Sequence, residues 1–265
     1  MTKYIPKDVD HDVNVSPEHP LQDFAILVAG LAVFVAGLVG VAIFMSGHLA
    51  KSISLDKEVK LFESRNSKRK KAPDKIVKFV EELYRPYIPD DSVKLNVTVS
   101  ISPQINAYAS LGGQIILTNG LLKQTVTENE LAFVVCHEIG HHYNRDVIQG
   151  VGANLIIAIA GTALGLDGVL SNISQSLSVN SFSRQEETRA DEFALDCVHK
   201  KYGHVAGSDH FFRRLQSQSF TPEDFLMFEV LSTHPFHEGR IEHLKSYSES
   251  KGYPLEGDLV RFEHK

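Results

Sequence analysis

Two histidines and one glutamate occur within five consecutive residues, His137-Glu138-Ile139-Gly140-His141. On a helix, residues four apart share one face, so the imidazoles of His137 and His141 can bind the same zinc ion. Glu138 would then lie beside a metal-bound water and act on it as a general base. The following residue, His142, lies about 100° further round the helix and is predicted to be a surface neighbour.

The residues before this motif predict the helix that it needs. Thr127 can cap a helix, Glu130 can complete a capping box, and Val126 can pack against Leu131. The apolar run LAFVV follows directly, so the histidines are expected on the buried part of a helix. This context separates the motif from a chance coincidence among the 13 histidines of the chain.

Two histidines leave a zinc ion short of a protein ligand. Downstream, the segment SRQEETRAD (residues 183–191) leads into the apolar positions of a second helix. From residue types alone, its acids suit the solvated start of a helix, where the helix dipole favours negative charge. The residues by themselves therefore do not choose a third ligand.

A family resemblance does choose one. Four segments in order resemble the HtpX-like membrane zinc endopeptidases, a group related to the CAAX prenyl endopeptidases among the gluzincins: NAYASLGGQIILTNGLL, ENELAFVVCHEIGHHYNRDV, SRQEETRAD and STHPFHEGRI. The resemblance covers residues 74–245. It implies one Zn²⁺ per chain, with His137 and His141 as ligands and Glu138 as the general base. It also implies a zincin-like domain.

The same resemblance assigns the remaining parts of the site. The motif S-R-x-x-E-x-x-A-D implies that the third zinc ligand is Glu187, not Glu186. It implies that the carboxylate of Asp191 holds a ligand imidazole in its metal-binding tautomer. In STHPFHEGRI, it implies that His234 stabilises the oxyanion and that Arg240 orders the wall of the cleft. The residues there equally fit a plain helix start around Pro235.

A long apolar segment changes the class of protein. Residues 24–45 contain no charged side chain, and as a helix they would extend about 33 Å, enough to cross a bilayer. A signal peptide would have a basic start and a shorter apolar run, and a core helix would be interrupted by polar residues. We therefore expect one transmembrane helix, in contrast to the several spans of HtpX-type chains.

The flanking cations predict an orientation. Residues 4–23 contain only Lys7, whereas residues 46–65 contain four basic residues, and more follow directly. The positive-inside rule then predicts a single-pass protein of the cell (inner) membrane with a cytoplasmic catalytic domain. We expect an acidic tail over 1–23, a transmembrane helix over 24–45, a basic linker over 46–73 and the peptidase domain over 74–265.

Within that domain the fold class is predicted to be α+β, mainly helical, with a small β-sheet. Apolar spacing predicts a helix over 74–85, and KLNVTVSIS alternates as a half-buried strand. A hairpin should turn at Gly112-Gly113. By analogy with zincins, the free edge of its second strand was expected to bind an extended substrate through the four residues Gln114, Ile115, Ile116 and Leu117.

Composition excludes some functions. The net charge of −6 gives no basic field, so nucleic acid is not an expected partner. Cys136 and Cys197 form no disulfide framework and suit a reducing compartment as small buried residues. The apolar stretch 147–170 is expected to pack within the domain or against the membrane surface, because both zinc ligands flanking it must lie on one side of the bilayer.

The predicted function is therefore zinc-dependent hydrolysis of peptide bonds in protein or peptide substrates, with misfolded or membrane-associated proteins implied by the resemblance. The alternative is a membrane-bound zinc-binding scaffold or chaperone without proteolysis, in which Glu138 would have no chemical task. A lipid-binding module with a structural zinc is weaker, because such sites usually offer four protein ligands, often cysteines. The sequence predicts no oligomeric state.

Overall fold

The computed structural model describes residues 20–66, 71–90, 93–150, 152, 182–217, 234 and 239–263. The chain divides into two compact units, Met1–Ala42 and Ile43–Lys265. Of the segment 147–170, whose packing the sequence predicts, residue 151 and residues 153–170 lie outside the described part.

Helix α1, Pro20–Ser52, contains the long apolar segment. Its portion Leu21–Ala42 has a mean hydropathy of 2.7, and none of it is buried inside the protein. Within the described residues, this is the one helix whose length and composition would let it cross a membrane. Its exposed apolar side chains distinguish it from the core helix of a soluble protein, although a signal sequence could show the same features.

Helix α2, Leu55–Asn66, follows in the second unit. The prediction of a solvated linker over 46–73 is wrong here, because the carboxylate of Glu58 is buried and Val59 packs against the core. Sequence composition alone suggested a linker because the helix buries few side chains and carries many charges. Helix α3, Asp74–Tyr84, confirms the predicted amphipathic helix and buries Phe79 and Leu83.

Three strands form the sheet: β1 Asn96–Ser100, β2 Ala107–Ser110 and β3 Gln114–Thr118. Their order is β1-β3-β2, with β1 parallel and β2 antiparallel to β3. The predicted hairpin turn at Gly112 and Gly113 is confirmed, and both residues have the positive φ that glycine tolerates.

This strand order corrects the expected substrate strand. β3 is the central strand, with β1 on one side and β2 on the other, so Gln114, Ile115, Ile116 and Leu117 have no free edge. All five β3 residues are buried, and β2 is an edge strand of the described sheet. The error arose because the hairpin was recognised from sequence whereas the parallel pairing of β1 with β3 is a long-range contact.

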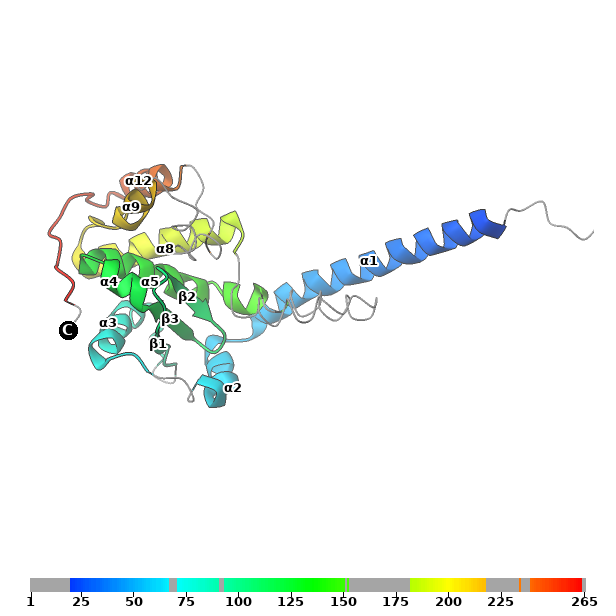
Figure 1. Cartoon of the computed structure of the whole chain (residues 1–265), viewed down its shortest axis with the longest axis horizontal. Helices are drawn as coiled ribbons and strands as arrows, with labels where there is room; N and C mark the ends of the chain where they lie inside the picture. Colours follow the sequence, from blue (N-terminus) through cyan, green and yellow to red (C-terminus); the bar gives the residue numbers. More distant parts are fainter. Residues whose placement is uncertain are drawn as a thin grey trace, which may run out of the picture. The chain divides into compact units, whose positions relative to one another are not determined.

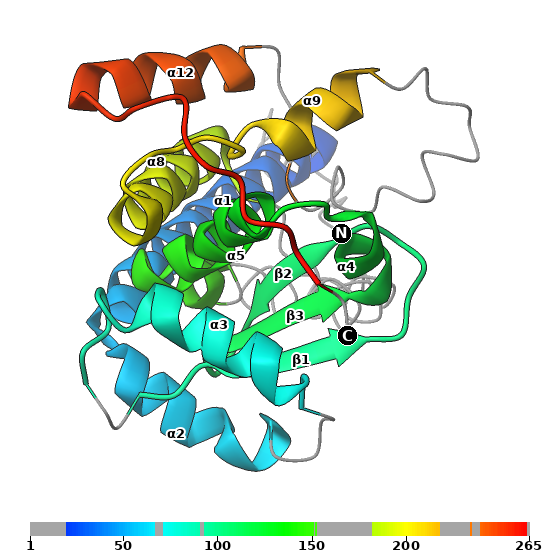
Figure 2. The same ribbon diagram turned by 90° about the vertical axis from the view of Figure 1, so that its left-hand side faces the viewer.

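Two long helices pack together beside the sheet. Helix α5, Glu128–Tyr143, lies between the sheet and helix α8, Arg184–Tyr202 (Figure 2). The short helices α4 (Asn119–Gln124), α9 (His210–Ser217) and α12 (Arg240–Lys251) complete the described fold (Figure 1). The predicted α+β, mainly helical class with a small sheet is confirmed.

The helix start at Thr127 is largely as predicted. The Thr127 hydroxyl accepts a hydrogen bond from the backbone N–H of Glu130. The Glu130 carboxylate reaches back one residue further than expected, to the N–H of Val126. Val126 is 64% exposed, so the expected packing against Leu131 is absent.

Gly140 sets the distance between the two long helices. A Cβ atom at Gly140 would lie 3.2 Å from the Cα of Ala190 in α8, closer than ordinary van der Waals contact. Residue 140 also lies directly before His141, so any displacement of α5 here would move a candidate ligand.

We predict that Gly140→Val lowers the free energy of unfolding by about 1–3 kcal/mol, because the added methyl groups overpack the α5–α8 contact. Lys78→Val, on the exposed face of α3, is the matched control and should cost only about 0.5 kcal/mol of helix propensity. Urea unfolding of the two variants measures both values. Equal losses would show that the two helices can separate without cost at this point.

Candidate active site

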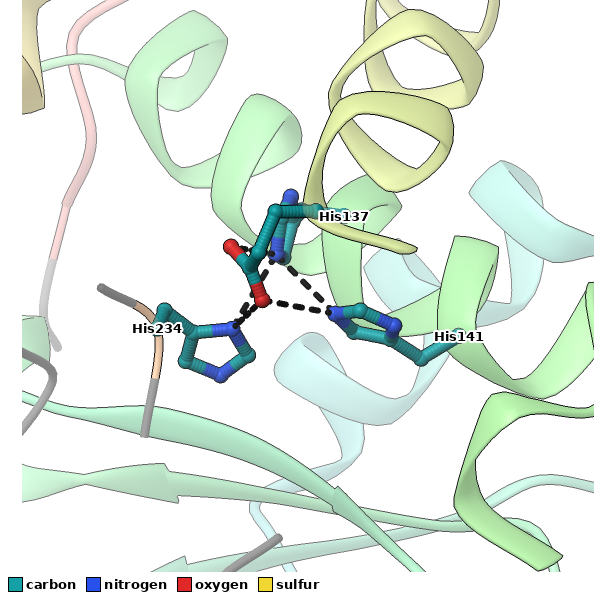
Figure 3. A group of neighbouring side chains, drawn as sticks. His137, His141 and His234 are labelled. Carbon is teal, nitrogen blue, oxygen red and sulfur yellow. Dashed lines mark hydrogen bonds and ion pairs between the residues drawn. The ribbon is translucent and has the colours of Figure 1, made fainter. Parts of the chain in front are cut away.

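The motif residues lie on the buried part of α5. His137, Glu138 and His141 are all nearly inaccessible to solvent. The capped N-terminus and the apolar run before them fix the rotation of the helix. His137 and His141 therefore direct their Nε2 atoms to one point, 3.2 Å apart (Figure 3).

Helix α8 brings a carboxylate to the same point. Ser183 and Glu186 form a complete capping box, in which the Glu186 carboxylate accepts the backbone N–H of Ser183. Glu186 is thereby committed to the helix start, and the next residue, Glu187, turns into the interior. The Glu187 oxygens lie 3.5 Å from His137 Nε2 and 3.6 Å from His141 Nε2. The structure thus places Glu187, and not Glu186, in the cluster.

These distances suit a metal ion. A tetrahedral zinc ion with bonds of about 2.0–2.1 Å would hold its ligand atoms about 3.4 Å from one another. The two Nε2 atoms lie 3.2 Å apart, Glu187 Oε2 lies 3.5 Å from that of His137, and Glu187 Oε1 lies 3.6 Å from that of His141. The donors are imidazole nitrogens and a carboxylate, which are ligand types that zinc accepts.

The outer nitrogens of both imidazoles face carboxylates. His137 Nδ1 lies 2.9 Å from Asp191, and His141 Nδ1 lies 3.0 Å from Asp146. A carboxylate accepts hydrogen bonds, so each Nδ1 carries the proton and each Nε2 presents a lone pair. Two lone pairs aimed at one buried point repel each other unless a proton or a metal ion lies between them. The described residues thus fit a metal site with oriented imidazoles.

Asp146 was not among the predicted residues. It follows the catalytic helix, five residues after His141, and its second oxygen pairs with Arg189 at 3.0 Å. The sequence signal was present in the segment HHYNRDV, because a carboxylate just beyond a ligand-bearing helix can return to it. The prediction considered only acids on α8 for this role, and Asp191 does serve His137 as the resemblance implied.

The surroundings shift the protonation of the two imidazoles in opposite directions. Burial lowers the pKa of His137 below its usual value, against the opposing charges of Glu187 and Asp191. Burial acts in the same sense on His141. There, hydrogen bonds to Asp146 and Glu187 outweigh it and raise the pKa to about 9.

Arg240 neutralises the carboxylates behind the cluster. Its Nε and Nη2 donate to Asp191 at 2.6 and 2.7 Å, and Nη2 lies 3.1 Å from Glu187. Burial acts to raise the pKa of Asp191, but Arg240 and His137 hold it at about 2. The guanidinium also lies over the ring of Phe212. Arg240 thus contacts two carboxylates of the site, and its role in ordering the wall of a cleft stays a prediction.

His234 enters the same cluster. Its Nδ1 lies 2.8 Å from Glu187 Oε1 and 3.2 Å from His137 Nε2 (Figure 3). Its Nε2 lies 3.5 Å from Glu138 Oε1. The atoms that His137, His141, Glu187 and His234 offer all lie within 4.8 Å of one another. His234 is therefore buried in the site. The residues around Pro235 that would form the alternative helix start lie outside the described part.

The edge strand β2 reaches Glu138. The backbone N–H of Ala109 donates to Glu138 Oε2 at 2.7 Å. Glu138 is thereby held beside the metal-binding atoms rather than among them. The sheet edge that reaches Glu138 belongs to β2, and not to the expected substrate residues of β3.

His142 corrects another expectation. It was predicted to be a surface neighbour, but it is buried, and its Nε2 donates to the carbonyl of Gln114 in β3 at 3.0 Å. His142 therefore ties the catalytic helix to the sheet. The helical angle separated it correctly from the ligands, but did not show that β3 occupies that side. On the other side of the cluster, the ring of Phe182 stacks on His141.

The two cysteines are linked. Cys136 and Cys197 are both buried, as predicted, but they form a disulfide bond that joins α5 to α8. Local sequence patterns do not predict this pairing, because 61 residues separate the two cysteines. The bond lies next to His137 in the chain. It covalently links the helix of the two histidines to the helix of Glu187.

Comparison with known proteins agrees with this site. The family model described as Peptidase family M48 matches residues 74–248. The match includes every candidate site residue. The expectation of a metallopeptidase family is confirmed, and both the choice of zinc and the narrower HtpX-like assignment stay predictions.

Curated relatives are proteases by name. Metalloprotease LoiP of Escherichia coli (strain K12) is 26% identical over 167 residues, 60% of this chain and 64% of LoiP. The beta-barrel assembly-enhancing protease of the same organism is 28% identical over 158 residues, 52% of this chain and 31% of the relative. Human mitochondrial metalloendopeptidase OMA1 is 25% identical over 158 residues, 54% and 30% of the two chains. The match thus spans less than two thirds of each relative.

We predict that Glu187→Ala weakens zinc binding by more than about 100-fold, exceeding the effect usual for a residue that only supports a ligand. Glu186→Ala is the matched control. It removes one hydrogen bond of the capping box, costs about 1 kcal/mol of helix stability and leaves the metal in place. Competition with a chromophoric chelator measures both affinities. Equal affinities in the two variants would remove Glu187 from the metal site.

Proposed function

Because the chain belongs to peptidase family M48, we propose that it is a membrane-anchored zinc endopeptidase. The observation that carries the proposal is the buried donor set of His137, His141 and Glu187, with the Glu138 carboxylate held at its side. Nitrogen and carboxylate donors at this spacing favour zinc, one ion per chain. When bound there, the ion would polarise a substrate carbonyl and lower the pKa of a bound water.

Glu138 is the proposed general base. Its carboxylate is anchored by the Ala109 N–H at one oxygen, and the other oxygen faces His234. From this place it can take a proton from the attacking water and deliver it to the leaving amine. The reaction is then the addition of water across the peptide bond, with one carboxylate carrying the proton between the two steps.

We propose that an extended substrate pairs with β2 instead of β3. Asn106 faces β3, since its carbonyl accepts the N–H of Thr118. Backbone groups alternate in direction along a strand, so those of Ala107 and Ala109 face away from β3, toward Glu138. Pairing at this edge would bring a substrate backbone to the base. Main-chain hydrogen bonds of this kind give affinity with little preference for side chains.

His234 is proposed to stabilise the oxyanion. Its imidazole is buried among the donors and borders both Glu138 and Glu187, so a neighbouring oxyanion would be within reach of an imidazole N–H. Arg240 is proposed to support it indirectly, because it fixes Glu187 and Asp191 by charge and hydrogen bonding.

Helix α1 is the proposed anchor. Its exposed segment Leu21–Ala42 is apolar all round and has no polar face that could be directed to water. Within this framework residues 24–45 are the proposed transmembrane segment, and the peptidase domain follows helix α1. Membrane-associated or misfolded proteins are the proposed substrates, because an anchored enzyme that pairs with backbone can act on accessible extended segments near the bilayer.

The disulfide changes the proposed side of the membrane. Flanking cations predict a cytoplasmic domain, but long domains cross a membrane largely regardless of charge. A disulfide bond is removed by the thiols of the cytoplasm and persists in an oxidising compartment. Since Cys136 and Cys197 are bonded, we propose that the peptidase domain faces the oxidising side.

The alternative function, a zinc-binding membrane scaffold without proteolysis, is less well supported. It would need the three metal ligands but not Glu138. A scaffold gives the Glu138 carboxylate, which lies beside the donor atoms, no chemical task.

We predict that Glu138→Gln keeps zinc bound and lowers kcat for casein by about 10²–10⁴-fold, because the amide cannot accept the proton of water. Removal of the metal with a chelator should abolish activity of the wild type, and added zinc should restore it. Glu128→Gln, at the distant start of α5, is the control and should retain activity. Hydrolysis of casein at the wild-type rate by Glu138→Gln would exclude this residue as the base.

The orientation has its own test. We predict that a thiol introduced by Lys57→Cys, on the exposed face of α2, reacts with a membrane-impermeant maleimide in intact cells. Cys136 and Cys197 should react only after unfolding and reduction. Labelling at position 57 only after permeabilisation, together with free thiols at both native cysteines, would restore the cytoplasmic orientation.

A further inference from the structure

Helix α2 places one buried carboxylate between two segments of the active site. Glu58 is 1% exposed, although it precedes the part of the chain that the family model matches. One of its oxygens accepts the backbone N–H of Gly112 at 2.8 Å, and the other lies 2.6 Å from Arg145 Nη1. A buried charge is costly unless it is paired and hydrogen-bonded, and Glu58 has both kinds of partner.

The first partner belongs to the turn after the edge strand. Gly112 and Gly113 connect β2 to β3, and α2 lies against this turn (Figure 1). The approach is so close that a Cβ atom at Gly113 would come within 2.8 Å of the Val59 side chain. Glu58 thus fixes the end of β2, three residues beyond the Ala109 N–H that holds the catalytic carboxylate Glu138.

The second partner belongs to the turn after the catalytic helix. Arg145 has a φ of 64°, a left-handed backbone conformation that costs free energy in a residue with a side chain. This turn lets the next residue, Asp146, reach back to His141 Nδ1. The guanidinium is fixed at both ends, by Glu58 and by the carbonyl of Ile53 at 2.8 Å. The ion pair therefore holds the conformation on which the Asp146–His141 contact depends.

We propose that Glu58 is a positioning residue for the peptidase reaction, acting through Gly112 on β2 and Glu138 and through Arg145 on Asp146 and His141. The catalytic unit then begins at helix α2, not at residue 74. The inference rests on the proposed function, since it concerns the same site. It adds that a helix directly after the membrane anchor sets the geometry of both the base and a ligand imidazole.

The test compares Glu58→Gln and Arg145→Lys in the full chain. Glu58→Gln keeps a hydrogen-bond acceptor for Gly112 but removes the charge. Arg145→Lys keeps the charge but removes the planar guanidinium that contacts both Glu58 and the carbonyl of Ile53. We expect each to lower kcat about 10–100-fold with KM changed less than about threefold, and to weaken zinc binding about 10-fold. Lys60→Gln, on the exposed side of the same helix, is the control and should match the wild type.

The double variant decides whether the two residues act as one unit. If they do, the double variant Glu58→Gln/Arg145→Lys should be no less active than the less active of the two single variants. Activity is normalised to the folded fraction from thermal unfolding, so a loss that only follows unfolding overturns the proposal. Additive losses, or kcat and zinc affinity equal to those of Lys60→Gln, also overturn it. Zinc affinity is measured without substrate, so it tests the positioning role of Glu58 and Arg145 even if the wild type proves to hydrolyse no casein.

Discussion

The arrangement depends on burying several charges at one place. Four carboxylates, those of Glu138, Glu187, Asp191 and Asp146, lie around the two motif histidines, and only two guanidinium groups, those of Arg240 and Arg189, pair with them. With neutral imidazoles, this leaves two negative charges in a region of low dielectric, where an uncompensated charge is expensive. A divalent cation bound by the imidazoles and Glu187 would balance them. Without a metal ion, protonation of His141, whose pKa is raised to about 9, offsets part of this negative charge instead.

That charge balance requires the two ligand-bearing helices to keep a fixed separation. Gly140 permits their backbones to approach closely, and the Cys136–Cys197 disulfide links them covalently. His142 then ties α5 to the sheet through the carbonyl of Gln114. On α5 each of these contacts lies one residue from a candidate ligand, so the rigid packing of α5 acts directly on the position of the donors rather than only on overall stability.

The sequence predicted those parts of the site that local chemistry determines. Helical spacing predicted that His137 and His141 would converge, because the period of a helix fixes which residues share a face. The choice of Glu187 came from resemblance alone, and the structure supplies its physical reason: Glu186 is held by the helix cap. The features that were missed all depend on long-range pairing. They are the order of the strands, the disulfide, the return of Asp146 to His141 and the burial of Glu58.

In the proposed reaction, the contact between Ala109 and Glu138 would connect substrate binding to the chemical step. Without a substrate, the Ala109 N–H is the donor that holds one oxygen of Glu138. A substrate that pairs with β2 as proposed would bring its own carbonyl to the same edge, and the two acceptors would compete for one donor. Pairing would then release the carboxylate oxygen at the moment when a peptide bond is in place. The Glu138 carboxylate would therefore keep its hydrogen bond to β2 until a substrate pairs with this strand. Its position before that depends on the contact between Glu58 and Gly112, which fixes the end of β2.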